Sequence, residues 1–93
     1  MSEEPQQVEL LWLDIESILS FFIGITSTKA IQYLGMPLKP DDEPAKDLER
    51  ARLAIDITSF MVEKLEPYTD EEEKKQLKQV VSSLQFSYLR ESA

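Results

Sequence analysis

Apolar side chains recur every three or four residues along three stretches of the chain, the spacing of one face of an α-helix. No stretch shows the strict alternation that is typical of a half-buried strand. We expect the first helix to be capped by Asp14 and to end near Gly35, ahead of Pro37. Its apolar row comprises Ile15, Ile18, Leu19, Phe22, Thr26, Ala30 and Tyr33.

The segment Val8–Leu13, ahead of this helix, allows more than one interpretation. Val8, Leu11, Trp12 and Ile15 also share a helical face. The first helix could therefore begin near Gln6 and run on without a break. A separate short helix, or an extended arm, fits the same residues.

A connector with three prolines, Gly35–Ala45, separates the first helix from the second. We expect the second helix to run from about Pro44 to Leu65, where Pro67 stops it. Its buried row comprises Leu48, Ala51, Ile55, Thr58, Val62 and Leu65, widened by Leu53, Ile57, Phe60 and Met61. A polar stripe follows the same spacing at Glu49, Arg52, Asp56, Ser59 and Glu63.

The third helix has the clearest predicted start. Thr69 and Glu72 have the spacing of a capping box, in which each side chain bonds the backbone amide of the other residue. The expected buried row comprises Leu77, Val80, Val81, Leu84 and Tyr88. The fold class is therefore all-α: a small bundle of three main helices, with a fourth short N-terminal helix left open. Residues 14–93 form one domain, and residues 1–13 are an arm or a helix extension.

The first helix is apolar on nearly all sides between Ile18 and Ile25. Such a helix has to be buried all round, and two neighbours in a three-helix monomer cannot cover it. We therefore expect a homo-oligomer, with a dimer favoured, although Leu10–Leu13 could instead fold over the exposed side. The candidate interface residues are Trp12, Ile18, Phe21, Phe22, Gly24, Ile25, Phe60 and Phe86.

Composition narrows the chemistry. The 93 residues include no cysteine and no histidine, and 18 acidic residues outnumber 10 basic ones, for a net charge of −8. Disulfides, thiol catalysis, imidazole metal sites and Ser-His-Asp catalysis are thereby excluded. The acidic balance argues against a nucleic-acid partner. We expect a protein that is not an enzyme and holds no cofactor or metal.

Two features of the sequence bear on its cellular location. The N-terminus has no basic region ahead of an apolar stretch, so a cytoplasmic protein is expected. The longest uncharged run, Ser17–Thr28, would span about 18 Å as a helix, against roughly 30 Å of bilayer hydrocarbon. A membrane partner is therefore not expected.

Three groups of charged residues are candidate polar sites. Arg52 and Asp56 have the spacing of a helical ion pair, and either a solvated stripe or a buried acid would fit them. The acidic run Asp41–Glu43 lacks the spacing of a calcium loop and suits a solvated turn. The lysines at 74, 75 and 78 follow three glutamates, as helix-dipole complements do.

These helices and their turns, taken together, resemble the small bacterial proteins of the domain of unknown function 1844 family. The resemblance rests on Tyr33-Leu34-Gly35, on Asp47-Leu48 followed by Ala51 and Ile55-Asp56, and on the run Leu65-Glu66-Pro67-Tyr68-Thr69-Asp70-Glu71-Glu72. It covers about Asp14 to Arg90. The family's glycine-containing turn is replaced here by Lys64–Tyr68. The resemblance implies a small all-helical protein and carries no activity.

The function that these observations favour is a non-enzymatic, oligomeric protein–protein interaction or scaffold module. One alternative is a peripheral membrane-associated protein that uses the Trp12–Ile25 region. A further alternative is small-ligand or metal binding through carboxylates, or an enzyme in which Asp56, Tyr33 or Tyr88 lines a pocket.

Overall fold

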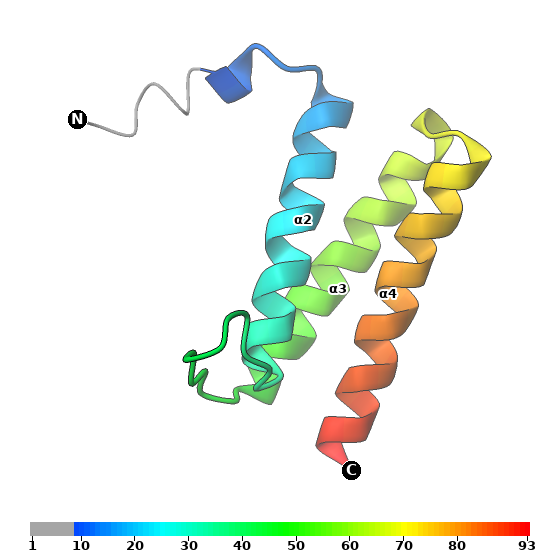
Figure 1. Ribbon diagram of the computed structural model, residues 1–93. Helices are drawn as coiled ribbons and strands as arrows, with labels where there is room; N and C mark the ends of the chain where they lie inside the picture. Colours follow the sequence, from blue (N-terminus) through cyan, green and yellow to red (C-terminus); the bar gives the residue numbers. More distant parts are fainter. Residues whose placement is uncertain (1–8) are drawn as a thin grey trace.

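Three long helices form the protein, as the periodicity predicts. The computed structural model describes residues 9–93, and no strand occurs among them. The elements, in chain order, are α2 (Ile15–Tyr33), α3 (Leu48–Leu65), the 3₁₀ turn η1 (Glu66–Tyr68) and α4 (Glu71–Ser92). Figure 1 shows α2 and α4 on either side of α3. The central helix of the chain is therefore α3, which packs against both of the others.

The chain turns before α2 begins. Residues 9–11 are helical, and a turn and bend at Trp12 and Leu13 separate them from α2. Trp12 and Leu13 donate their N–H groups back to Glu9 and Leu10, which closes the turn. The N-terminal segment therefore does not continue α2, and the part of the predicted arm formed by residues 1–8 lies outside the described residues.

The predicted end of α2 is confirmed. Gly35 has φ +90°, a conformation that L side chains rarely adopt. Its N–H donates to the Gln32 carbonyl at 2.9 Å, and the Met36 N–H donates to the Ile31 carbonyl at 3.2 Å. This pair of bonds is the Schellman ending of a helix. At the other end Asp14 holds the cap position, but its side chain makes no capping hydrogen bond.

The starts of α3 and α4 lie a little further along the chain than predicted. Helix α3 begins at Leu48 instead of Pro44, because the Asp47 carboxylate accepts from the Arg50 N–H at 3.1 Å. The Asp47 N–H donates to the Tyr33 carbonyl at 2.8 Å and so ties the connector to the end of α2. The helix therefore begins after Asp47, whose side chain caps it, and not at Pro44 one turn earlier.

The predicted capping box at the start of α4 is also wrong. Asp70 caps the helix by accepting from the Glu73 N–H at 2.8 Å. The Thr69 hydroxyl instead donates to the Glu66 carbonyl at 2.9 Å, which closes η1. Since Thr69 is committed to that turn, the neighbouring aspartate takes the cap.

The core is small and lies along α3. One cluster joins Ala30, Ala54, Ile55 and Leu84, and a second joins Ile23, Val62 and Leu65. The predicted row of α3 is buried at Ala51, Ile55, Thr58, Val62 and Leu65. The prediction for α2 needs correction: Ile23 and Ala30 are buried, whereas Ile15 and Phe22 are exposed. On α4, Leu84 is buried and Val80 is 38% exposed.

Small side chains let α2 and α3 approach each other closely. Ala30 and Ala51 are 0% exposed, as is Thr58. The Thr58 hydroxyl donates to the Ala54 carbonyl at 2.7 Å and lies 2.6 Å from the Thr26 hydroxyl. The Thr26 hydroxyl also lies 3.4 Å from the Ile23 carbonyl of its own helix, so either threonine can donate in the bond between them. This bond is a part-buried polar link between two helices, and it fixes their register.

Removing the Thr26–Thr58 hydrogen bond tests how much it contributes to the stability of the protein. Thr58→Val keeps the volume but takes away the hydroxyl that bonds Thr26, so we expect the free energy of unfolding to fall by about 1–2 kcal/mol. Thr28, an exposed threonine on α2, is the matched control, because its hydroxyl bonds only the Gly24 carbonyl of its own helix. Thr28→Val should change stability by less than about 0.5 kcal/mol. Urea denaturation measures both, and equal losses would contradict the assignment.

Candidate functional site

Most of the predicted interface residues are exposed in the single chain. Trp12 is 82% exposed, and Phe60 and Phe86 are 59% and 65% exposed. On α2, the exposed fractions of Phe21, Phe22 and Ile25 are 48%, 41% and 43%; Gly24 is exposed and Ile18 is half-buried. These residues belong to three helices and to the segment before α2.

One helix carries most of them. Ile15, Ile18, Phe21, Phe22 and Ile25 form what we call the α2 apolar row. At about 100° per residue these side chains share one side of α2, next to the buried face. The rings of Phe21 and Phe22 lie 5.9 Å apart, centroid to centroid, tilted by 54°. The row contains no charged side chain.

Helix α3 carries a second exposed row, of which the sequence pattern singled out one member. Leu53, Ile57 and Phe60 form the α3 apolar row, with Leu53 and Ile57 58% and 42% exposed. Leu53 and Ile57 were expected only to widen the apolar row of the buried face, which is wrong, whereas Phe60 was also a candidate interface residue. The spacing of four and three is the signal that could have revealed the row.

The candidate polar pair is solvated. Arg52 Nε lies 3.9 Å from Asp56 Oδ2, and the two side chains are 72% and 69% exposed. They border an open groove of about 460 Å³ between α3 and α4, completed by Ile55, Gln85, Tyr88 and Leu89. An exposed helical pair of this kind contributes about 0.3–0.5 kcal/mol. Asp56 is therefore a surface carboxylate and not a buried acid.

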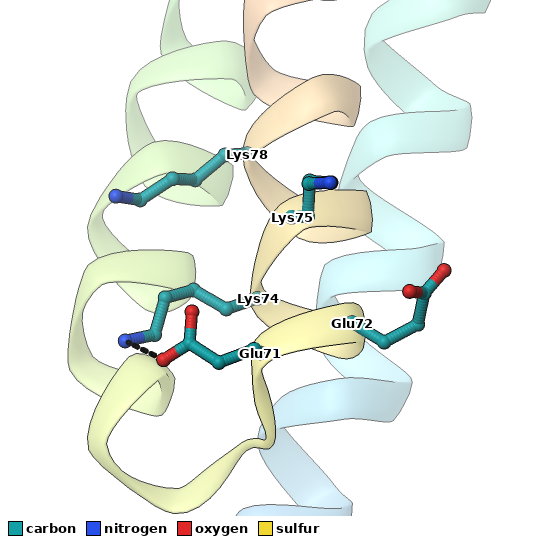
Figure 2. Close-up of a pocket in the computed structure, with 5 residues that line it drawn as sticks. All are labelled: Glu71, Glu72, Lys74, Lys75 and Lys78. Carbon is teal, nitrogen blue, oxygen red and sulfur yellow. Dashed lines mark ion pairs between the residues drawn. The ribbon is translucent and has the colours of Figure 1, made fainter.

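The lysine cluster at the start of α4 does not converge on one point. Figure 2 shows Lys74 and Lys78 extending to one side of the helix, while Glu72 and Lys75 extend to the other. Lys74 Nζ lies 3.6 Å from a Glu71 oxygen, and Lys78 Nζ lies 3.8 Å from one of Glu66. Neighbouring glutamates thus balance these charges, and the geometry is that of a solvated first turn.

Hydrogen bonds within the acidic connector hold its conformation. Asp42 Oδ2 accepts from the Leu38 N–H at 3.1 Å, and the Asp42 N–H donates to the Lys39 carbonyl at 3.0 Å. Within residues 9–93, no group of three or more acidic side chains is placed to hold a metal ion. Over the same range, no helix is long and apolar enough to cross a membrane.

One ion pair ties the connector to the far end of α4. Lys46 Nζ lies 2.7 Å from Glu91 Oε1. This hydrogen bond and the charge of Lys46 lower the pKa of Glu91 from its ordinary 4.5, with a smaller contribution from Arg90. A lowered pKa in the folded state stabilises the protein above pH 4.5. The contribution is lost as the pH falls through the lowered pKa of Glu91.

The cause of this shift can be tested by substitution. Lys46→Met removes the main partner, so we expect the pKa of Glu91 to rise toward 4.5. Arg90→Met is the matched control, because Arg90 Nε lies 3.9 Å from Glu91 and contributes least. NMR titration of the side-chain carboxyl carbon gives both values. A larger rise with Arg90→Met would contradict the assignment.

Comparison with known proteins places the chain in a family. No curated protein and no solved structure matches it. The model of one protein family, described as domain of unknown function (DUF1844), matches residues 17–90. The match begins within α2 and ends within α4, so it spans the three packed helices. The resemblance carried by the helix motifs is thereby confirmed, and the chain belongs to the domain of unknown function 1844 family.

Proposed function

We propose that this protein is a non-enzymatic interaction or scaffold module that works as an oligomer and binds through the α2 apolar row. The observation that carries the proposal is the exposure of this row. Phe21, Phe22 and Ile25 each leave more than two fifths of their surface in contact with solvent. Neither α3 nor α4 covers them, because those helices pack on the side of α2 that holds Ile23 and Ala30.

The free energy of burying apolar side chains supports binding through this row. Fully burying a large apolar side chain stabilises a complex by about 1.5–3 kcal/mol relative to leaving it exposed. Large aromatic side chains such as Phe21 and Phe22 are typical anchors of protein interfaces. A chain of 93 residues with a small core also gains stability from association. An uncharged row on a chain of net charge −8 is a place where a partner can approach without removing charges from water.

Sedimentation velocity tests the proposal. The wild-type protein is expected to sediment as a dimer, twice the chain mass of 10.7 kDa, at micromolar concentration. Phe22→Glu places a charge in the row and should give the single-chain mass. Ser20→Glu is the matched control, an exposed position on α2 outside the row, and should leave the dimer intact. A wild-type protein that stays at 10.7 kDa throughout would contradict the proposal.

Flotation with vesicles separates this proposal from a membrane-surface role. Four cationic side chains, Lys29, Arg50, Arg52 and Lys64, occur on the two helices that carry the exposed rows. Basic groups beside apolar ones are what a peripheral membrane protein uses on anionic lipid. We expect the intact protein to stay at the bottom of the gradient with phosphatidylserine vesicles. Recovery with the vesicles would overturn the interaction-module assignment.

A further inference from the structure

We propose that the partner is a second copy of this chain, bound through a face that α2 and α3 build together. This inference rests on the proposed function and adds to it the second helix of the interface. We call the surface the α2–α3 apolar face; it comprises the α2 apolar row and the α3 apolar row. A single copy leaves the face uncovered, and a second copy brings an identical face to cover it.

The contacts of α3 show on which side its row lies. Thr58 points at α2, and Ser59 follows it by about 100° of rotation. Ser59 and Glu63 line a groove together with Lys78 and Gln85 of α4, so that direction of rotation leads toward α4. Ile57 lies about 100° from Thr58 in the opposite direction, and Leu53 and Phe60 lie about 140° and about 160° round the same way, toward the back of α3. The α3 apolar row is therefore on the side away from α4.

The same reasoning applies to α2. Thr26 points at α3, and Ala30 and Ile31 lie to one side of it, in the cluster that contains Leu84 and Tyr88 of α4. Ile25 lies about 100° to the other side, and every member of the α2 apolar row falls in that half of the helix. The α2 apolar row and Ile57 thus lie beside the Thr26–Thr58 contact on the side away from α4, and Leu53 and Phe60 extend this face around α3.

The spacing of both rows suits helices as the covering partner. Ile15, Ile18, Phe22 and Ile25 follow one another at intervals of three, four and three, and Leu53, Ile57 and Phe60 at four and three. Intervals alternating between three and four place side chains along the seam of paired helices. In a two-fold arrangement, α2 and α3 of one copy pack on α2 and α3 of the other, as in a four-helix bundle.

The area of the face matches what a dimer needs. The exposed fractions along it run from 41% at Phe22 to 65% at Ile15, with Ile18 half-buried. With 150–250 Å² for a whole aromatic side chain and somewhat less for an aliphatic one, the eight side chains expose roughly 700 Å² per copy. Two copies would bury on the order of 1,400 Å², above the roughly 1,000 Å² that a specific interface requires.

The charges of α3 border the α3 apolar row. Asp56 and Glu63 line grooves shared with α4, whereas Glu49 and Asp56 precede Leu53 and Phe60 by four residues and so share a face of the helix with them. The Lys64 ammonium lies over the Phe60 ring, 5.4 Å from its centroid, and Arg50 is 3.3 Å from Asp47. Lys64 and Arg50 thus place positive charge beside the same row, on a chain of net charge −8.

Two phenylalanines provide a matched pair of variants. Phe60, in the α3 apolar row, is 59% exposed and has Lys64 over its ring; Phe86, on α4, is 65% exposed and has Arg90 over its ring at 5.7 Å. We expect Phe60→Lys to raise the dissociation constant of the dimer roughly a hundredfold, because a two-fold interface carries the substitution twice. Phe86→Lys should leave it within about threefold of the wild-type value.

Sedimentation equilibrium measures these constants, with Ile57→Lys as a second variant that should behave like Phe60→Lys. Circular dichroism confirms that each variant keeps its helix content, as expected for exposed positions. A dimer that persists in Phe60→Lys and Ile57→Lys but is lost in Phe22→Glu would overturn the α2–α3 apolar face and leave the proposed function standing. Loss only in Phe86→Lys would overturn the face as well. A wild-type monomer, with or without vesicle binding, would overturn both.

Discussion

The close contact between α2 and α3 determines the arrangement of the rest of the molecule. Small side chains, Ala30, Ala51 and Ala54, line it, and the Thr26–Thr58 hydrogen bond fixes its register. Small side chains fill the contact around Thr58, and the larger Ile23, Val62 and Leu65 pack together within it. One flank is closed by Leu77, Val81 and Leu84 of α4. The other flank stays open as the α2–α3 apolar face.

Much of the fold follows from the sequence because two signals agree. The helical spacing of the apolar residues marks the helices, and the glycine and proline residues mark where they end. The positive φ of Gly35 and the buried positions Ala51, Ile55, Thr58, Val62 and Leu65 are where the pattern puts them. The starts of α3 and α4 were misplaced because several residues there can cap a helix, and only the local hydrogen bonds of Asp47 and Asp70 decide between them. The sequence pattern therefore left the helix starts undecided among neighbouring capping residues.

The candidate site was less predictable, for a physical reason. Helix α2 is apolar on two sides, so the period alone cannot say whether Phe22 or its neighbour Ile23 faces the core. Tertiary packing buries Ile23 against Val62 and Leu65. The sequence did reveal that one chain could not cover all of α2. It could not reveal that Leu53 and Ile57 join the uncovered surface, because that depends on which side of α3 meets α4.

The central claim is that a second copy covers the α2–α3 apolar face. The most direct measurement is an isotope-filtered NOE experiment on a mixture of ¹³C-labelled and unlabelled protein, which detects only contacts between copies. The account predicts intermolecular NOEs from the methyl groups of Ile25 and Ile57 to the aromatic protons of Phe22 and Phe60. Intermolecular NOEs confined to Phe86 and Leu89 on α4, or none at all at millimolar concentration, would contradict it.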